Sequence, residues 1–193
     1  MNLINGAKII GNIELVILNS SRRKLKYIEG GKNMSMEAYN QAKEIILSNA
    51  ELSDFVGPRS RELIIQAEEK LGLKFTGSYL DFLLSFGAGN FGSQEIFGII
   101  SSDFENSSVP DAIWYTLTER RESNLPNNLL IIHDTGSDEV FCLDFNKDNN
   151  EPKVVSFFPG VDLDKQKYEI IANDFGDFLL DLVKRELYYL DWL

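Results

Sequence analysis

Three short apolar runs in the second half of the chain constrain its fold most strongly. They span residues 128–133, 139–145 and 153–158, and the linkers between them hold only five and seven residues. A crossover between parallel strands needs about a dozen residues or more, so linkers this short join antiparallel neighbours. Both linkers are rich in Asp and Asn, with one Gly or Pro each, which is typical of hairpin turns. The runs therefore predict an antiparallel meander.

Helical periodicity lies on both sides of this meander. Residues 36–49 carry apolar side chains at positions i, i+3 and i+7, which predicts an amphipathic helix. A last helix is predicted to begin after Asn173 and to run to about Tyr188, with an apolar face that includes Phe175 and Phe178.

Three further helices are predicted between these two. One begins at Ser60, a good N-cap residue, and ends at Gly72. The next runs from near Ser78 to Gly87, and the third lies within residues 108–123. The third has a proline at a predicted first-turn position, followed by an aspartate close to the positive end of the helix dipole.

The remaining segments complete the predicted architecture. Residues 87–92 are interpreted as a glycine-rich turn, and residues 94–100 as a strand. Helices at both chain ends around a meander give an α+β fold, with an antiparallel sheet and helices packed on it. A chain of 193 residues, 44% of them hydrophobic, is enough for one core, which predicts a single domain over residues 34–193.

Residues 1–33 are predicted to be an N-terminal extension. A ribosome-binding sequence in the gene can encode Glu29, Gly30 and Gly31. One hypothesis is therefore that translation begins at Met34 or Met36 and that residues 1–33 are not synthesised. The alternative is a genuine hairpin, because two apolar runs flank a turn dipeptide near residue 11.

The charge is unevenly distributed between these two parts. Residues 1–33 hold six basic and two acidic side chains, a net charge of +4. The net charge of the whole chain is −11, so residues 34–193 carry −15. An acidic body repels nucleic acid and anionic lipid and attracts a basic partner. The alternative is that the acidic surface serves solubility alone.

Localisation follows from what the sequence lacks. Cys142 is the single cysteine, so no internal disulfide forms, and the apolar stretch at residues 3–18 is interrupted by charged and polar residues with no cleavage site. No run of about 18 apolar residues exists to span a membrane. A cytoplasmic protein is expected.

Enzymatic chemistry finds little support in the sequence. His133 is the only histidine, and a triad of Cys142, His133 and Asp134 across the hairpin is the one arrangement worth considering. Cys142 lies in an apolar strand, where a buried, inert thiol is expected. We therefore expect no catalytic residues and no enzyme.

Metal, cofactor and nucleic-acid sites are not expected either. The acidic loop 144–151 lacks the glycine and the glutamate of a calcium loop, since Asn149 and Val155 stand at those positions. The glycines of residues 87–92 follow a helix, whereas a phosphate-binding loop follows a strand. The basic pair Arg120 and Arg121 is typical of solvated salt bridges.

A surface that binds a protein partner is the remaining prediction. Three groups are candidates: an acidic stripe on the last helix, an acidic rim on the first hairpin, and two neighbouring aromatic residues that suit an interface. The alternatives are a solvated or capping role for the aspartates and core packing for at least one aromatic residue. The candidates are Asp174, Asp177 and Asp181 on the helix, Asp134, Asp138 and Glu139 on the hairpin, and Trp114 and Tyr115.

The order of these motifs resembles the SUKH superfamily over about residues 58–185. Residues 64–92 are similar to its helix, Leu-Gly, Tyr-x-x-Phe-Leu and glycine-turn signature, residues 125–145 to its strand pair, and residues 173–182 to its closing helix. Phe75-Thr76 stand where the family has Leu-Pro. The matching signature residues are Glu68, Leu71, Gly72, Tyr79, Phe82, Leu83, Gly87 and Gly89.

The resemblance implies an α+β fold around a central antiparallel sheet, with no catalytic residues and no cofactor. It implies an immunity protein that binds and neutralises a cognate toxin, often a nuclease, and the acidic body suggests that this toxin is basic. The alternative is a non-enzymatic scaffold or regulatory protein of cell-envelope metabolism, because fungal relatives regulate cell-wall synthesis through protein contacts.

Overall fold

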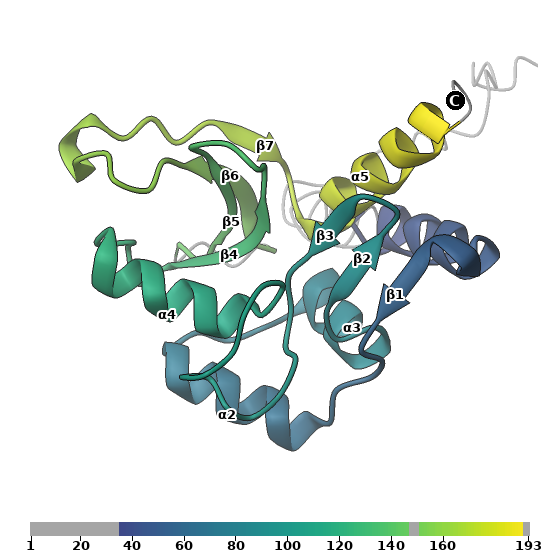
Figure 1. The fold of residues 1–193 in the computed structure, drawn as a ribbon, viewed down its shortest axis with the longest axis horizontal. Helices are drawn as coiled ribbons and strands as arrows, with labels where there is room; N and C mark the ends of the chain where they lie inside the picture. Colours follow the sequence, from purple (N-terminus) through teal and green to yellow (C-terminus); the bar gives the residue numbers. More distant parts are fainter. Residues whose placement is uncertain (1–34, 147–150, 191–193) are drawn as a thin grey trace, which may run out of the picture.

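The computed structural model describes residues 35–146 and 151–190, and the predicted extension over residues 1–33 lies outside them. The predicted α+β fold is confirmed (Figure 1). The first described helix covers residues 35–48. The other elements are η1 (Ala50–Leu52), β1 (Ser53–Phe55), α2 (Arg61–Leu71), α3 (Gly77–Ser85), β2 (Gly89–Phe91), β3 (Gln94–Ile96), α4 (Ala112–Glu122), β4 (Leu129–Asp134), β5 (Val140–Asp144), β6 (Lys153–Phe157), η2 (Leu163–Lys165), β7 (Ile170–Ala172) and α5 (Phe175–Leu190).

The predicted meander is confirmed as a four-stranded antiparallel sheet in the order β4-β5-β6-β7. The register places Ile131 opposite Cys142 and Cys142 opposite Val155. Side chains alternate between the two faces of a strand, so these three residues share one face of the sheet. The fourth strand, β7, was not predicted; it returns after a long connection and pairs with β6.

A second sheet of three strands corrects the interpretation of residues 87–92 as a turn. Gly89–Phe91 form β2, which pairs with β1 on one side and β3 on the other. The glycine at position 89 permits this, because a Cβ atom there would lie 2.1 Å from the backbone oxygen of Asp54 in β1. The strand predicted over 94–100 ends at Ile96, because the next two backbone N–H groups donate to Ile132 and Pro110 and not to β2.

Two contacts join the small sheet to the large one. The backbone N–H of Phe97 donates to the carbonyl oxygen of Ile132 at 2.9 Å. One residue further along β4, the His133 ring lies 2.7 Å from the carbonyl oxygen of Glu95 through Nδ1, which must donate because a carbonyl oxygen only accepts. The two sheets are therefore fastened at β3 and β4.

The predicted helices are confirmed to within a residue or two at their starts. The Ser60 side chain accepts a hydrogen bond from Leu63 N at 3.2 Å, as expected of an N-cap. Gly72 ends α2 in the left-handed conformation, with φ of 69°. The α3 helix starts one residue earlier than predicted, at Gly77.

Helix α4 begins with a buried aspartate, not with a proline. The Asp111 side chain accepts hydrogen bonds from the backbone N–H groups of Ile113 and Trp114, both at 3.0 Å, and is the N-cap. Pro110 was predicted to occupy the first turn, but it precedes the cap, because the aspartate side chain takes the first free N–H groups of the helix.

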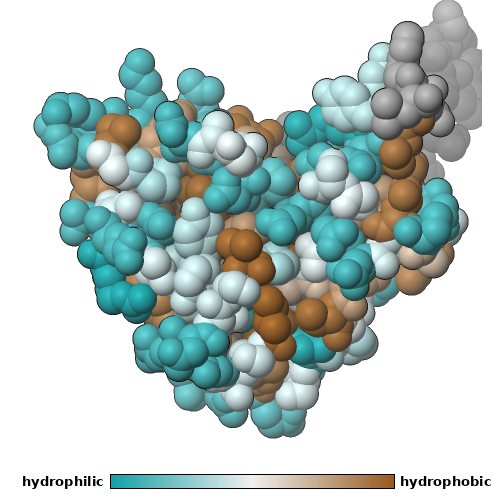
Figure 2. Space-filling model, in the orientation of Figure 1, coloured by the Kyte–Doolittle hydropathy of each residue, from teal (hydrophilic) through white to brown (hydrophobic). Residues whose placement is uncertain are grey.

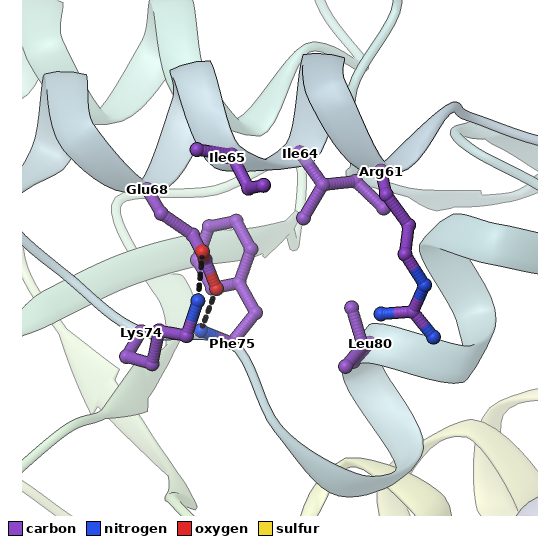
Figure 3. A pocket seen from close by; sticks show the side chains of 7 residues that line it. All are labelled: Arg61, Ile64, Ile65, Glu68, Lys74, Phe75 and Leu80. Atoms are coloured by element: carbon purple, nitrogen blue, oxygen red, sulfur yellow. Dashed lines mark hydrogen bonds and ion pairs between the residues drawn. The ribbon is translucent and has the colours of Figure 1, made fainter.

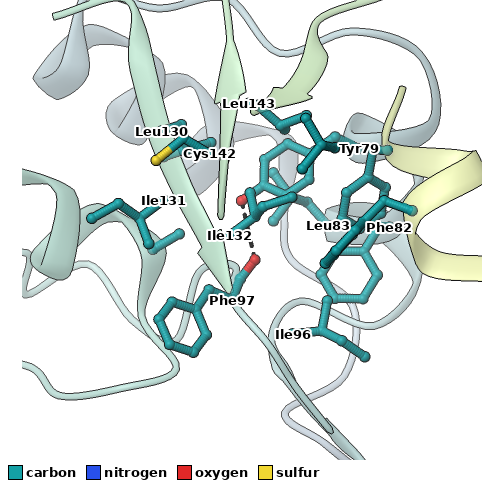
Figure 4. Packing of buried hydrophobic residues seen from close by; sticks show 14 of the residues in the cluster. Tyr79, Phe82, Leu83, Ile96, Phe97, Leu130, Ile131, Ile132, Cys142 and Leu143 are labelled. Atoms are coloured by element: carbon teal, nitrogen blue, oxygen red, sulfur yellow. Dashed lines mark hydrogen bonds between the residues drawn. The ribbon is translucent and has the colours of Figure 1, made fainter. Parts of the chain in front are cut away.

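The core lies between the sheets and the helices α3 and α5 (Figure 4). Tyr79 is fully buried, and its hydroxyl donates to the Phe97 carbonyl oxygen at 3.3 Å. Its ring packs edge-on against Phe175 of α5, with 5.0 Å between ring centroids. In the described part of the chain, none of the helices is both long and apolar enough to cross a bilayer.

Candidate protein-binding surface

Two of the three predicted groups of contact residues lie side by side. The Tyr115 hydroxyl on α4 donates a hydrogen bond to Asp134 Oδ2 at the end of β4, at 3.0 Å. The rings of Trp114 and Tyr115 stack with centroids 6.0 Å apart. We call the set formed by Trp114, Tyr115, Asp134, Asp138 and Glu139 the α4–hairpin surface.

The packing of α4 on the sheet explains why these residues meet. The Thr116 hydroxyl accepts a hydrogen bond from the backbone N–H of Ile131 at 3.0 Å, which fixes the helix over β4. The Tyr115 ring then packs 5.8 Å from Phe97, so it is half-buried as well as part of the surface. Burial, together with the neighbouring carboxylate of Asp134, raises the pKa of the Tyr115 hydroxyl, which keeps it protonated as a donor.

The β4–β5 hairpin holds its own shape through short-range bonds. Asp134 Oδ1 accepts from the backbone N–H of Gly136 at 2.8 Å, and the Thr135 hydroxyl donates to the Glu139 carbonyl oxygen at 2.7 Å. The carboxylates of Asp138 and Glu139 have no hydrogen bond or ion pair in the part of the chain that the structure describes. Their negative charge is therefore uncompensated at this edge.

The acidic stripe predicted on the last helix is not formed as expected. Asp174 is only 8% exposed and accepts from the Asp177 backbone N–H at 2.8 Å, so it serves the start of α5. Burial raises the pKa of this carboxyl group. Asp181 is exposed but forms an ion pair with Arg185 at 3.1 Å. Among the described residues, no hydrogen bond or ion pair joins these aspartates to the α4–hairpin surface.

The considered triad of Cys142, His133 and Asp134 is not assembled. His133 stacks on Phe141, with ring centroids 5.7 Å apart, and faces Phe178 of α5. Cys142 follows Phe141 on β5, so its side chain points to the opposite face, beside Ile131 (Figure 4). Burial also raises the pKa of the Cys142 thiol, which disfavours the reactive thiolate.

The acidic loops do not gather into a metal site. Over residues 35–146 and 151–190, no group of three or more His, Cys, Asp or Glu side chains is arranged to hold a metal ion. Asp144, at the start of the loop once compared with a calcium loop, accepts hydrogen bonds from Asn128 and from Asn146. These bonds close the end of the strand pair.

A small pocket between α2 and α3 was not foreseen from the sequence (Figure 3). Its volume is about 160 Å³, which suits a single side chain but is below the usual size of a ligand site. Glu68 lies at one end of the pocket, where it accepts from the Phe75 N–H at 2.7 Å and from Lys74 Nζ at 2.5 Å. The lining residues are Arg61, Ile64, Ile65, Glu68, Lys74, Phe75 and Leu80. The sequence feature that could have indicated this pocket is Ile65, an isoleucine outside the apolar stripe of α2.

The surface around α4 and the four-stranded sheet is predominantly hydrophilic on the face seen in Figure 2. Hydrophobic residues gather instead near the middle of this face and along α5. Within the α4–hairpin surface, Asp134, Asp138 and Glu139 supply the negative charge, and Trp114 and Tyr115 are the large aromatic side chains.

Comparison with known families places these observations in context. The model of the SUKH_5 family, described as "SMI1-KNR4 cell-wall", matches residues 33–184. The chain belongs to this family. The resemblance found in the sequence is thereby confirmed, over most of the chain.

A solved structure shows a more distant likeness. It is described as the crystal structure of a protein from Pseudomonas syringae pv. tomato, and it is 17% identical with a TM-score of 0.47. The match covers 63% of this chain and 86% of that one. No curated protein matches the chain at a significant level. The assignment to the SUKH_5 family therefore rests on the family match.

The SUKH signature residues serve the fold in this structure. Tyr79, Phe82 and Leu83 are fully buried in the core, and Glu68 holds the segment that links α2 to α3. Gly87 adopts φ of 77°, a conformation that favours glycine, where α3 gives way to β2. The shared residues therefore define the scaffold, and the α4–hairpin surface lies outside them.

Proposed function

We propose that this SUKH protein is an immunity protein, which binds and neutralises a basic toxin domain through the α4–hairpin surface. The observation that carries the proposal is the uncompensated charge of Asp138 and Glu139 beside the stacked rings of Trp114 and Tyr115. The sequence resemblance to bacterial immunity proteins supports the same function.

The two kinds of side chain contribute differently to such a complex. Exposed carboxylates attract a cationic surface over several ångströms and speed the encounter, an effect that salt screens. Aromatic side chains bury a large area with few rotatable bonds, so they slow dissociation. Neutralisation then requires only that the bound protein occludes the toxin, and no chemistry on this chain is involved.

The test is co-expression with any toxin domain that a neighbouring gene encodes. We expect growth rescue, a stable complex by gel filtration, and an association rate that falls steeply with salt. The double variant Asp138→Asn, Glu139→Gln should slow association about three- to tenfold. The matched control removes the same charge elsewhere, as Glu51→Gln with Asp54→Asn, and should bind like the wild type.

Absence of both rescue and complex would end this proposal. The second candidate, a scaffold or regulatory protein of cell-envelope metabolism, is favoured by the "cell-wall" description of the matching family. That function requires a specific partner from envelope synthesis in a pulldown and no effect of toxin expression. The same surface variants would then be tested against that partner.

A further inference from the structure

Glu119 is a buried carboxylate without a hydrogen bond or ion pair to any residue that the structure describes. The residue is 8% exposed, and its Oε2 atom is inaccessible and without a hydrogen bond. Removing a carboxylate from water costs several kcal/mol unless hydrogen bonds or a counter-charge replace the lost hydration. A buried carboxylate oxygen without a hydrogen bond is unusual among native proteins and calls for an explanation.

The geometry of α4 aims Glu119 at the sheet. Thr116, one turn earlier on the same side of the helix, is bonded to the backbone of β4. The chain after α4 anchors on the same residue, because the N–H groups of Ser123 and Leu125 donate to the Glu119 carbonyl oxygen at 2.9 and 3.1 Å. These two bonds fix the backbone at the end of α4, and with it the position of the Glu119 Cα atom.

The surroundings of Glu119 are anionic and aromatic. Its charge adds to burial in raising the pKa of the Cys142 thiol on the facing strand, together with that of Asp144. The Tyr168 ring lies 6.4 Å from the ring of Phe157, and Phe157 pairs with Val140, which shares the face of Cys142 on β5. Asp144 lies two residues after Cys142 on β5, so Glu119, Asp144 and the Tyr168 ring lie on one side of the sheet.

The nearby cations do not serve this cluster. Arg120 turns away and donates to the carbonyl oxygens of Leu71 and Asn127, at 2.9 and 2.7 Å. Arg121 pairs with Glu105. Lys153, opposite Asp144 in the register, is exposed and forms no ion pair with a described residue.

The sheet surrounds this cluster on its concave side. In Figure 1 the four strands curve, with α4 along one side of the curve and the connection between β6 and β7 along the other. Ile170 pairs with Val155, so it shares the face of Cys142, and it is 60% exposed. Ile170 therefore presents an exposed apolar side chain on the same face of the sheet as Asp144.

We infer that Glu119 receives an arginine side chain that the protein partner inserts at the concave side of the sheet. This inference rests on the proposed function and names the group on the partner. A guanidinium forms paired hydrogen bonds with a carboxylate and stacks on aromatic rings, so it matches Glu119 and Asp144 beside Tyr168. It supplies the counter-charge that Glu119 lacks.

The direct test uses ethylguanidinium chloride as the probe and amide NMR as the readout. We expect saturable shifts at millimolar probe for amides of residues 115–122 and 142–144, in excess of those caused by sodium chloride at equal ionic strength. Glu119→Gln should abolish them, whereas Glu122→Gln, an exposed acid on the same helix, should leave them unchanged. Shifts that do not saturate, or that persist in Glu119→Gln, overturn the inference.

Stability and toxin binding separate this role from a structural one. Glu119→Gln removes an orphaned charge, so its urea midpoint should equal or exceed that of the wild type. A lower midpoint shows that Glu119 stabilises the fold and overturns the inference.

In the toxin complex, the same variant should bind 10- to 100-fold more weakly through faster dissociation. If the wild type binds no toxin, the proposed function fails, while the ethylguanidinium titration still decides the role of Glu119.

Discussion

His133 and Cys142 lie on adjacent paired strands but on opposite faces of the four-stranded sheet. His133 stacks with Phe141, the strand neighbour of Cys142, and alternation along β5 turns the thiol to the other side. The two side chains therefore cannot act on one substrate group, which is why the proposed function needs neither of them.

Cys142→Ser tests this conclusion. The thiol is fully buried, so a hydroxyl in its place should lower the free energy of unfolding by about 1–2 kcal/mol in urea denaturation. Binding and neutralisation of the partner should survive. A variant that folds normally but loses all function would instead support an enzyme that uses this residue.

The pH dependence of stability should reveal His133. Burial lowers the pKa of its ring, helped by Arg185, and this outweighs the opposing effects of the Glu95 hydrogen bond and of Asp134. As pH falls below about 6.5, the unfolded chain takes up the proton first, so this contribution to stability is complete above that pH and is lost as pH falls toward the folded-state pKa. Denaturation between pH 7.5 and 5.5 should show a smaller loss for His133→Gln than for the wild type; equal slopes would contradict this.

Glu186 fastens the last helix to the hairpin between β2 and β3. Its carboxylate accepts from Ser93 N at 2.9 Å, from Ser93 Oγ at 2.7 Å and from Gln94 Nε2 at 3.1 Å. Although burial raises the pKa of this group, these bonds bring it below its ordinary value. Glu186→Ala should cost about 2–3 kcal/mol in chemical denaturation, because the donors of the hairpin lose a charged acceptor.

Lys184→Ala is the control for this measurement. Lys184 is exposed on the same helix, and its removal should change the free energy of unfolding by less than about 0.5 kcal/mol. Equal losses for the two variants would show that helix propensity, and not the Glu186 contacts, accounts for the effect.

Trp114→Ala addresses the aromatic part of the α4–hairpin surface. Trp114 is half-buried and its ring stacks on Tyr115, so its removal should weaken partner binding at least about tenfold in calorimetry. Tyr115→Phe deletes only the hydroxyl that bonds Asp134 and should cost about 1 kcal/mol of stability. Unchanged affinity in Trp114→Ala would place the interface elsewhere.

Elements of the fold that carry their own periodicity could be predicted from the sequence. The helix at residues 35–48, α2 with Ser60 and Gly72 at its ends, and the meander β4–β6 all follow from local patterns. Strands β1, β2 and β7 have three residues each and exist through pairing with distant segments, for example Phe55 with Gly89. Three residues cannot display a period, so these strands were missed.

The site shows the same division between local and distant causes. The sequence does not distinguish Asp174 from an exposed aspartate, but its carboxylate is buried because it accepts a hydrogen bond from a free N–H group at the start of α5. Glu119 was overlooked because an acidic residue on a helix is usually solvated. Here it lies with Thr116 on the side of α4 that faces the sheet, and it is buried. The hydrogen bond between Tyr115 and Asp134 depends on how α4 packs on the sheet, so the sequence alone does not reveal it.

The self-contained bonding of the β4–β5 hairpin has an evolutionary consequence. Residues 136–138 contribute no side chain to the core, and the loop closes through contacts among its own members. Gly136 is restrained by its φ of 74°, but the exposed side chains of Ser137 and Asp138 can change while the strands beneath them stay as they are. Under the proposed function, an immunity protein can therefore acquire a new specificity at Ser137 and Asp138 and keep its architecture.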